Sequence, residues 1–502
     1  MWVNIMNRRK ISIIGAGPGG LSAAMILSYR GYDVTVFEKE ADPGGRNRAF
    51  HLGPYTFNFG PTFFMLPDVL KEIFFLSGKK FENYLDLIRI EPMYNLAFAN
   101  TEIQHFCDQQ MMQHEIETKF PDNKNAFKNF LSKEKVRFER MYPCLKKSYS
   151  SIFSMVSMPL IRALPQLSIF KSLFQVLNHY FNGEQLIISF TFQSKYLGMS
   201  PWKCPGAFGI IPYIEHKYGI DYLRGGLGTI SVAMSEVAAE NGAKFRLLTP
   251  VHKVVVKNGT AQGVELDNGE FVPSDAVVLN ADFGFAMKTL FAPGVIKKWN
   301  PENLLKKTYS CSTFMLYLGL DTQYKEHHHT ILFADDYRNE MGSIEKNEKL
   351  NEDFSVYLNN ASIVDSTLAP PGHSALYVLV PVSNLKSSMQ WTKEECVAFR
   401  NKIINRIKLR TSMKDIDQHI KAEFIISPRD WEQNHNLFIG ATFNLGHTLN
   451  QMLYFRPHNR FEEVNRLYLC GGGTHPGSGL PTIFESGRIS SDLISKDLPL
   501  KK

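Results

Sequence analysis

The chain has 502 residues, of which 44% are hydrophobic and 21% charged, and its formal net charge at pH 7 is +7. At about 100–200 residues per domain this length predicts two to four structural units, and the composition excludes a disordered chain, a fibrous repeat and a small disulfide-held or metal-held fold. The charge excess is mild and comes with no basic arm or zinc-finger spacing, so we expect no nucleic-acid partner.

Aromatic composition is the unusual feature, with 37 Phe against 20 Tyr and 5 Trp. Phe carries no hydrogen-bonding group, so the excess indicates either contact with a hydrocarbon or ordinary core filling. The six cysteines form no CxxC pair, which indicates free thiols in a reducing compartment. The stretch from Met1 to Lys10 is too short and polar for a secretory signal, and the uncharged stretches 11–29 and 467–484 contain Gly and Pro clusters, so we expect no transmembrane helix.

The first predicted unit is a strand, a glycine turn, a helix and a second strand. An apolar run at 10–14 precedes the turn, a helical pattern covers 21–27, and a buried strand over 34–37 ends at Glu38. Gly15, Gly17 and Gly20 match the GxGxxG fingerprint, in which the backbone approaches a pyrophosphate and the helix N-terminus attracts it. Glu38 lies 18 residues after the third glycine, where a carboxylate binds ribose hydroxyls and favours FAD or NAD over NADP.

The middle of the chain combines one helical region with strand patterns. A helix is predicted over 127–140, and residues 143–183 carry Lys146, Lys147, Arg162 and Lys171 but no acidic residue among many apolar side chains. That segment indicates either a helical hairpin lying in a membrane interface or an ordinary buried helix pair. Strands are predicted at 245–248, 252–256 and 276–279, with hairpin turns at 258–259 and 267–269, and runs at 310–320 and 375–382 predict a second sheet that walls a substrate site.

Two further glycine turns bear on the cofactor. One at 42–46 follows the ribose-binding strand, where Arg46 approaches the phosphates or the flavin. Near the C-terminus, a strand over 467–470 leads into the glycine run 471–479 and a helix from about residue 482. Such an element brings a helix N-terminus to the pyrimidine end of a flavin, where negative charge accumulates on reduction. Glycine elements at opposite ends of the chain indicate a long cofactor, and therefore FAD.

Several motifs together resemble those of the bacterial carotenoid desaturases of the phytoene desaturase family, and most of all its dehydrosqualene (4,4'-diapophytoene) desaturases. The motifs are the fingerprint, the Gly44-Gly45-Arg46 turn, residues 55–62, 222–226, 309–312 and 455–457, and the run 473–479. The similarity extends from about Lys10 to Ile494. Asn58 departs from the pattern, because many relatives carry Asp there, so a hydrogen bond is kept at that position while a charge is lost.

The resemblance implies an α/β fold with a Rossmann-type FAD-binding domain of the glutathione reductase/amine oxidase type, a mixed substrate domain of sheet and helices, and a helical membrane-associating region. The FAD-binding domain is expected to be discontinuous, at 10–85, 236–300 and 436–502. A helical insertion at 86–235 is expected to line the substrate and associate with the membrane, and residues 301–435 are expected to bind substrate.

The implied activity is FAD-dependent desaturation of a colourless C30 or C40 polyene such as 4,4'-diapophytoene, by hydride transfer to flavin N5 and proton loss from the neighbouring carbon. The protein would be cytoplasmic and peripheral at the inner face of the cell membrane, with a quinone or oxygen as electron acceptor. Because a developing allylic cation makes the neighbouring proton acidic, we assign no catalytic base.

The resemblance also implies which residues bind the cofactor. They are Gly15, Ala16, Gly17, Pro18, Gly19, Gly20, Glu38, Lys39, Gly45, Arg46, Pro61, Thr62, Val251, Gly472, Thr474, His475, Gly479, Leu480 and Pro481. For His475 two roles stay open, contact with the cofactor or support of its turn. Arg224, Gly225 and Gly226 are expected to line the substrate, while a surface ion pair is an equal alternative for Arg224.

No metal site is expected. His327, His328 and His329 are consecutive, so their side chains point in different directions, and no other ligand motif accompanies them.

Three alternative functions stay open: a carotenoid oxidase that acts on terminal methyl groups of an already desaturated chain, a flavin amine oxidase, and a non-catalytic carrier of prenyl lipids with the same nucleotide-fold ancestry. The motifs around Gly225 and Pro476 argue against the amine oxidase, and the intact fingerprint with Glu38 and Gly479 argues against the carrier.

Overall fold

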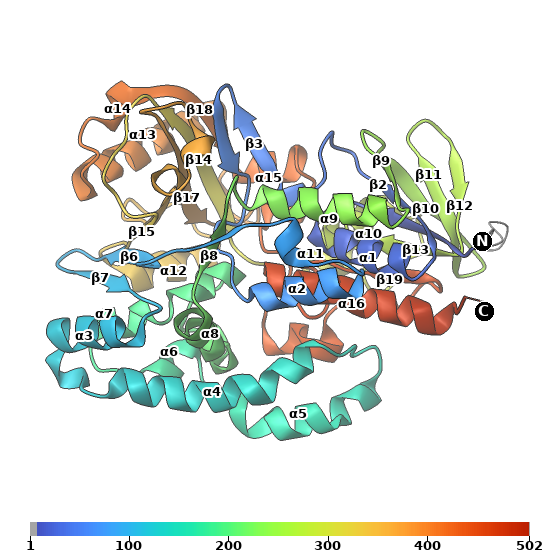
Figure 1. Cartoon of the computed structure of the whole chain (residues 1–502), viewed down its shortest axis with the longest axis horizontal. Helices are drawn as coiled ribbons and strands as arrows, with labels where there is room; N and C mark the ends of the chain where they lie inside the picture. Colours follow the sequence, from blue (N-terminus) through green and yellow to red (C-terminus); the bar gives the residue numbers. More distant parts are fainter. Residues whose placement is uncertain (1–7, 501–502) are drawn as a thin grey trace.

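The structure, a computed structural model, describes residues 8–500. Most of the stretch from Met1 to Lys10, on which the expectation about a secretory signal rests, lies outside the described residues. Two main sheets with helices against them lie above a helical insertion in the view of Figure 1.

The first sheet is parallel, with five strands in the order β19-β13-β1-β2-β9. Its strands are β1 (Lys10–Ile14), β2 (Asp33–Phe37), β9 (Lys244–Arg246), β13 (Ala276–Leu279) and β19 (Leu467–Leu469). The apolar residues of β1 and β13 are buried, as helices covering a parallel sheet require. These strands come from the three separate ranges expected for the FAD-binding domain.

Helices α1 (Pro18–Tyr29), α9 (Gly228–Glu240) and α16 (Leu480–Asp497) belong to this layer, and α1 contacts both of the others. A Cβ on Gly487 of α16 would collide with the Gly19 carbonyl oxygen of α1, so this close contact requires glycine. Helix α2 (Pro67–Leu76) packs against α1 and α16. The predicted first strand, helix and second strand are confirmed, and the last helix begins two residues before its predicted start.

An antiparallel sheet of three strands follows β9: β10 (Val251–Lys257), β11 (Thr260–Leu266) and β12 (Phe271–Pro273). The predicted turn at 258–259 is confirmed, with Asn258 and Gly259 at positive φ. The turn at 267–269 is confirmed as well, because β11 and β12 pair on either side of it. Helices α10 (Phe283–Thr289) and α11 (Pro301–Leu305) lead on towards the second large sheet.

The second large sheet has seven strands in the order β18-β14-β17-β16-β15-β6-β7. They are β18 (Ile420–Ile426), β14 (Ser312–Leu320), β17 (Ser374–Val382), β16 (Val356–Asn360), β15 (His329–Leu332), β6 (Tyr94–Ala97) and β7 (Glu102–His105). β14 and β17 pair antiparallel from Ser312 opposite Val382 to Leu320 opposite Ser374, which confirms the predicted second sheet. β15 and β6 pair in parallel, so the sheet is mixed.

Short elements connect the layers. Strands β3 (Ala49–Leu52) and β4 (Tyr55–Asn58) form a hairpin, and β5 (Leu87–Arg89) pairs with β8 (Asp221–Leu223). Helices α12 (Tyr337–Glu345), α13 (Lys393–Arg410), α14 (Ile416–His419) and α15 (Pro428–Gln433) accompany the seven-stranded sheet.

The helical insertion lies at the lower edge of Figure 1. It contains α3 (Gln109–Lys119), α4 (Ala126–Leu145), α5 (Met158–Ala163), α6 (Leu173–Leu177), α7 (Glu184–Ser189) and α8 (Ile210–Tyr218). The predicted helix over 127–140 is confirmed within α4, but the hairpin expected over 143–183 is replaced by short helical turns. Pro159 and Pro165 each stand at the start of a new turn, because proline lacks the N–H that would continue the preceding one. Among residues 8–500, no helix has the length and apolar character needed to cross a membrane.

Candidate functional site

The fingerprint turn forms an open helix N-terminus beside the parallel sheet. The Gly15 N–H donates to the Phe37 carbonyl at 2.8 Å, and the first hydrogen bond inside α1 runs from the Leu21 N–H to the Gly17 carbonyl at 2.9 Å. No side chain caps this helix and no acidic residue stands in its first turn. The N–H groups of Gly19 and Gly20 therefore have no acceptor within the helix, which suits a phosphate.

Glycine at the fingerprint positions is required by close contacts. Gly15 has φ +93°, which favours glycine, and a Cβ on Gly17 would lie 2.9 Å from the Asn280 side-chain amide. A Cβ on Gly19 would lie 2.7 Å from the same amide and 3.0 Å from the Gly471 backbone nitrogen. The C-terminal glycine run therefore lies directly beside the fingerprint, although more than 400 residues separate them in the chain.

Glu38 is buried at the carboxyl end of β2, and it binds the fingerprint turn. Its Oε2 accepts the Ala16 N–H at 2.7 Å, and its Oε1 accepts the Glu40 N–H at 3.0 Å. Each oxygen keeps a lone pair for a ribose hydroxyl. Lys39 points away from the turn, because its ammonium group donates to the Asn434 carbonyl at 3.3 Å.

Val251 begins β10 and is half-buried. The Thr249 N–H donates at 2.8 Å to the carbonyl of Glu38, which follows the ribose-binding strand. Val251 stands two residues after Thr249 in the chain and therefore lies near the end of that strand.

The second glycine turn lies against the first. The Gly44 N–H donates to the Ala16 carbonyl at 2.8 Å, and a Cβ on Gly45 would lie 3.7 Å from Gly17 Cα. Arg46 donates to the Thr442 carbonyl and faces Asp282. Burial lowers the pKa of Arg46 and raises the pKa of Asp282, so these two opposite charges lie in a weakly solvated part of the site.

Pro61 and Thr62 directly follow Gly60, which lies against Arg46. A Cβ on Gly60 would lie 2.7 Å from the Arg46 carbonyl oxygen, so the residue preceding Pro61 touches the second glycine turn. The Thr62 hydroxyl and the Tyr357 hydroxyl are 2.6 Å apart, which joins this turn to β16 of the seven-stranded sheet. Thr62 therefore marks the point where the nucleotide layer meets the expected substrate region.

A buried arginine shapes the C-terminal glycine run. Arg456 is fully buried and donates to the carbonyls of Gly472 at 2.6 Å and of Thr474 at 3.2 Å, and to those of Leu445 and Gln451. Burial lowers the pKa of Arg456 to about 9. The sequence places Arg456 in the 455–457 motif. It does not show that the guanidinium group binds the glycine run, because these contacts come from the folded arrangement.

The remaining residues of this run form the start of α16. Gly479 stands before its first turn with φ +110°, no side chain caps the helix, and Leu480 and Pro481 are its first residues. This is a second open helix N-terminus, in the place expected from the sequence.

His475 lies behind the run. Its carbonyl accepts hydrogen bonds from Asn459 at 3.0 Å and Ser486 at 2.8 Å, and its ring packs edge-on against Tyr149 with 5.0 Å between centroids. Burial lowers the pKa of His475 to about 3, so the ring is neutral. These contacts match the supporting role among the two that the sequence left open.

The described residues fit FAD. Four features meet at one edge of the parallel sheet. They are glycine contacts that leave no room for a Cβ, two uncapped helix N-termini, the buried Glu38 and Arg46 of the second glycine turn. A dinucleotide needs this combination of close backbone, positive helix ends and a ribose-binding carboxylate.

The expected substrate-lining turn is held by two buried side chains. The Asn58 Oδ1 accepts the Leu227 N–H at 2.7 Å, and a Cβ on Gly226 would lie 2.8 Å from this oxygen. Asp365 accepts the Gly225 N–H at 2.6 Å. The amide of Asn58 thus supplies the hydrogen bond that this turn needs, without a charge.

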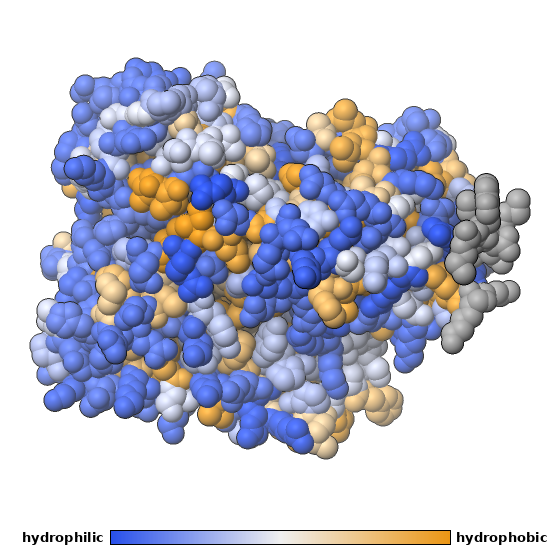
Figure 2. All heavy atoms as spheres, in the orientation of Figure 1, coloured by the Kyte–Doolittle hydropathy of each residue, from blue (hydrophilic) through white to orange (hydrophobic). Residues whose placement is uncertain are grey.

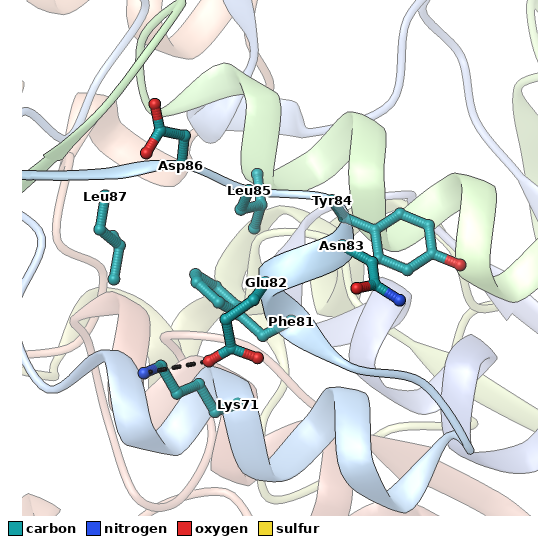
Figure 3. Close-up of a pocket in the computed structure, with 8 residues that line it drawn as sticks. All are labelled: Lys71, Phe81, Glu82, Asn83, Tyr84, Leu85, Asp86 and Leu87. Atoms are coloured by element: carbon teal, nitrogen blue, oxygen red, sulfur yellow. Dashed lines mark ion pairs between the residues drawn. The ribbon is translucent and has the colours of Figure 1, made fainter.

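Arg224 lies at the surface and forms an ion pair with Asp86 at 3.1 Å, with 57% of its side chain exposed. Asp86 borders a hollow of about 510 Å³ that is also lined by Lys71 and residues 81–87 (Figure 3). In Figure 3 the ammonium group of Lys71 faces Glu82, and the two are 3.3 Å apart. Arg224 therefore adopts the surface pairing rather than a position deep in the molecule.

The three consecutive histidines do not all separate as expected, because the rings of His328 and His329 lie edge-on with 4.2 Å between centroids. The His329 ring stacks on Phe63 at 4.2 Å and its Nδ1 lies 2.7 Å from the Tyr357 hydroxyl, whereas His328 packs against Tyr222. Within the described part of the chain, no group of three or more His, Cys, Asp or Glu residues is placed to hold a metal ion.

Comparison with known proteins agrees with this geometry. Residues 18–495 match the family described as flavin containing amine oxidoreductase. The chain is 48% identical to a 4,4'-diapophytoene desaturase (4,4'-diapolycopene-forming) of Methylomonas sp over 98% of this chain and 96% of that protein. It is 32% identical to a 4,4'-diapophytoene desaturase (4,4'-diaponeurosporene-forming) of Staphylococcus aureus over 97% and 99% of the two chains. The crystal structure of a putrescine oxidase covers 98% of this chain and 100% of its own, with a TM-score of 0.64 at 15% identity, and shares the fold.

Proposed function

The chain belongs to the flavin-containing amine oxidoreductase family, and on that premise we propose that it is an FAD-dependent carotenoid desaturase acting on a colourless C30 polyene such as 4,4'-diapophytoene. The observation that carries this proposal is the 48% identity to a diapophytoene desaturase along nearly the whole of both chains. The complete set of glycine contacts around the expected dinucleotide site supports it, because a carrier that does not use flavin has no need of them.

Bound FAD supplies a hydride acceptor, and the chain supplies the surroundings for an apolar substrate. One buried cluster lies between the helical insertion and strands β6 and β15, and it is rich in Phe. Its buried Phe residues are Phe98, Phe106, Phe127, Phe130, Phe138, Phe181, Phe190, Phe192 and Phe333. Nine of the 37 Phe residues are therefore buried in one cluster beside the Thr62 turn, where a polyene would reach the flavin and water would be excluded.

Incubating the FAD-loaded protein with 15-cis-4,4'-diapophytoene tests this function. New visible absorption bands of a longer conjugated chain are the expected result. No new bands together with aldehyde formation from a coloured polyene would favour the terminal oxidase, and peroxide release with an amine would favour an amine oxidase. Purified protein that lacks flavin absorption even after FAD is added would favour the carrier.

The electron acceptor is a quinone or oxygen in this proposal. Peroxide release under air and quinone reduction without air distinguish the two.

The proposal includes a peripheral site on the inner face of the cell membrane, carried by residues 152–170. Apolar side chains are exposed along this segment, and Phe153 and Phe170 are the most exposed, at 83% and 99%. The others are Ile152, Val156, Met158, Ile161, Leu164 and Ile169. Figure 2 shows apolar atoms along the lower right edge, where α5 lies in Figure 1. A contiguous apolar surface of this kind marks an interaction site in a folded protein.

Cations flank the apolar segment. Lys147, Arg162 and Lys171 are exposed, whereas Lys146 is occupied by an ion pair with Glu72 at 2.5 Å. Apolar side chains with Lys and Arg beside them favour a surface of anionic lipid, which attracts the cations while the apolar groups enter its outer layer.

A further inference from the structure

Arg456 is a buried positive charge without a carboxylate partner. Arg137 and Arg456 are the two most buried Arg or Lys residues in the described part of the chain, at 7% and 0% exposed. The Nε of Arg137 lies 2.8 Å from Glu134 Oε2, so its charge is neutralised within α4. No Asp or Glu among residues 8–500 lies within ion-pair distance of Arg456, and burial lowers its pKa to about 9 with no carboxylate near enough to raise it. The side chain is therefore charged at neutral pH, and no anionic side chain offsets it.

All hydrogen bonds of Arg456 go to backbone carbonyls. Its guanidinium group donates to Gly472 at 2.6 Å and to Thr474 at 3.2 Å, two residues expected to bind the cofactor. It also donates to Leu445 and Gln451 at 3.2 Å each and to Gly446 at 3.5 Å. These dipoles offset part of the cost of burying a cation, but they carry no net charge. The charge of Arg456 therefore calls for an anion from outside the chain.

The glycine run 471–479 lies between Arg456 and the fingerprint. The Gly472 carbonyl points at Arg456, so the N–H of Gly473, in the same trans peptide unit, points away from it. Within residues 8–500 this N–H has no hydrogen-bond acceptor. Towards the fingerprint, the Gly471 nitrogen lies 3.0 Å from the position of a Cβ on Gly19. Arg456 thus binds carbonyls of the run directly and leaves an N–H of the run open to a ligand.

The two imidazoles beside the run are neutral. The Nε2 of His447 accepts the Ser478 N–H at 3.1 Å, one residue before Gly479. Burial, and next to it the positive charge of Arg456, hold the pKa of His447 well below its ordinary value. Burial lowers the pKa of His475 to about 3, and the charge of Arg456 contributes there as well. The charge of Arg456 therefore acts along the run as far as the residues that precede α16, and neither imidazole adds to it or offsets it.

We propose that Arg456 stabilises the reduced flavin, as a positioning residue whose charge acts through the glycine run. This inference rests on the proposed function. Accepting the hydride of a polyene C–H bond adds two electrons and one proton to bound FAD, and the negative charge that this leaves lies on the pyrimidine ring. The run and the N-terminus of α16 are expected at that ring. Oxidised flavin is neutral there, so the fixed charge of Arg456 favours the reduced form and with it the loss of hydride from the polyene.

The first test titrates the FAD-loaded protein with sulfite, in the wild type, Arg456→Gln and Arg456→Lys. Sulfite adds to N5 of oxidised flavin and leaves the same negative charge on the pyrimidine ring, so this test needs no polyene. We expect Arg456→Gln to bind sulfite about tenfold more weakly than the wild type, the order of magnitude for one unit charge in a weakly solvated interior. Arg456→Lys keeps the charge and should stay close to the wild type. Bleaching of the visible flavin absorption measures the affinity.

The reduction potential of the bound flavin is the second readout. Reductive titration against a redox dye measures it in the same variants. We expect the potential of Arg456→Gln to lie about 30 mV below that of the wild type, which is the same tenfold change for a two-electron couple.

Arg460→Gln is the matched control. Arg460 stands four residues further along the chain, its side chain is 42% exposed, and it pairs with Asp497 at 2.6 Å. The variant removes the same charge from a position that is already paired and solvated. Sulfite affinity and potential should therefore remain those of the wild type.

Wild-type sulfite affinity and potential in Arg456→Gln would overturn the proposal. An equal loss in Arg456→Lys would overturn it too, because the contacts with the carbonyls and not the charge would then matter. Weaker FAD retention with an unchanged potential in Arg456→Gln would mean that the charge offsets the pyrophosphate instead.

A measurement on the wild type replaces Arg456→Gln if that variant does not fold. We expect the protein to take up one proton for each flavin reduced at mildly acidic pH, where free reduced flavin takes up two, and an uptake of two would overturn the proposal. The expected sulfite and potential shifts in a protein that desaturates no polyene would overturn the proposed function and leave the role of Arg456 intact.

Discussion

The glycine at position 20 lies where α1 passes the Gly15 carbonyl oxygen, and a Cβ at this position would collide with that oxygen. A Cβ on Gly17 or Gly19 would lie 2.9 or 2.7 Å from the Asn280 amide, which is also too close. The glycines of the dinucleotide fingerprint are therefore required by packing. Because they carry no side chain, they also leave the backbone N–H groups accessible to a phosphate.

We expect Gly20→Ala to lower the free energy of unfolding by about 1–3 kcal/mol, the usual cost of overpacking, and to weaken FAD retention. Denaturant unfolding and the ratio of flavin to protein after gel filtration measure the two effects. Gly342→Ala is the control, because Gly342 lies in α12 with nothing within 4 Å of the added Cβ. If Gly20→Ala retained as much FAD as the wild type, the backbone around the Gly15 carbonyl would accommodate the added Cβ, and the prediction would be wrong.

Glu215, in α8, is a fully buried carboxyl group, and its burial gives a prediction about stability. Its pKa is raised from the ordinary 4.5 to about 7 in the folded chain, so between these pH values the folded state holds a proton that the unfolded state has lost. The stability that this proton supplies is complete below pH 4.5 and disappears as pH rises through about 7.

Glu215→Gln carries no titrating group. Its free energy of unfolding relative to the wild type is therefore expected to rise by up to about 3 kcal/mol between pH 4.5 and pH 8. Denaturant unfolding at a series of pH values measures the difference. A difference independent of pH would mean that Glu215 is ionised in the folded chain throughout.

At the scale of elements, local patterns predicted more than long-range pairing. The runs that became β1, β2, β14 and β17 were read correctly, because their apolar residues and bounding turns lie next to each other in the chain. The parallel pairing of Tyr94–Ala97 with β15 was not predicted, since Asn95 meets Thr330 across more than 200 residues.

The candidate site shows the same difference between features that are local in the sequence and features that depend on long-range contacts. Glycine turns carry a spacing that can be recognised, so the fingerprint, Glu38 and Arg46 could be assigned to the cofactor from the sequence, and the structure brings them together. Arg456 was not assigned a role, because the contacts of a buried charge come from other elements of the fold.

The exposed apolar segment 152–170, which contains α5, leads to a prediction about membrane binding. Replacing Lys147, Arg162 and Lys171 together by Gln is expected to weaken binding to anionic vesicles by about 3 kcal/mol, at about 1 kcal/mol for each cation near the surface. Vesicle sedimentation at fixed ionic strength measures it.

The matched control removes the same charge elsewhere in the insertion, with Lys124, Lys128 and Lys133 replaced by Gln. These exposed lysines lie just before α4 and in its first half, outside residues 152–170, and should leave vesicle binding nearly unchanged. If both triple variants lost vesicle binding equally, the attraction would be a general effect of positive charge. If neither variant lost binding, the proposed membrane site would be wrong.

At the scale of the molecule, three parts meet at the Thr62 turn: the parallel sheet with its glycine turns, the seven-stranded sheet through Tyr357, and the helical insertion through the contact between the Phe63 and Tyr196 rings. The Phe-rich cluster belongs to the second and third parts, and the exposed apolar segment belongs to the third. In the proposed function, this arrangement gives a hydrophobic substrate a protein interior between the proposed lipid-binding surface and the flavin.

The central claim is that electrons pass from a colourless polyene to FAD held by this chain. The most direct measurement mixes the FAD-loaded protein with 15-cis-4,4'-diapophytoene without oxygen or quinone and follows flavin and polyene absorption together. We predict that the flavin bleaches as longer-wavelength polyene absorption rises, with one new double bond for each flavin reduced. An oxidised flavin and an unchanged polyene, in a protein whose flavin is reduced by another substrate such as an amine, would contradict the account.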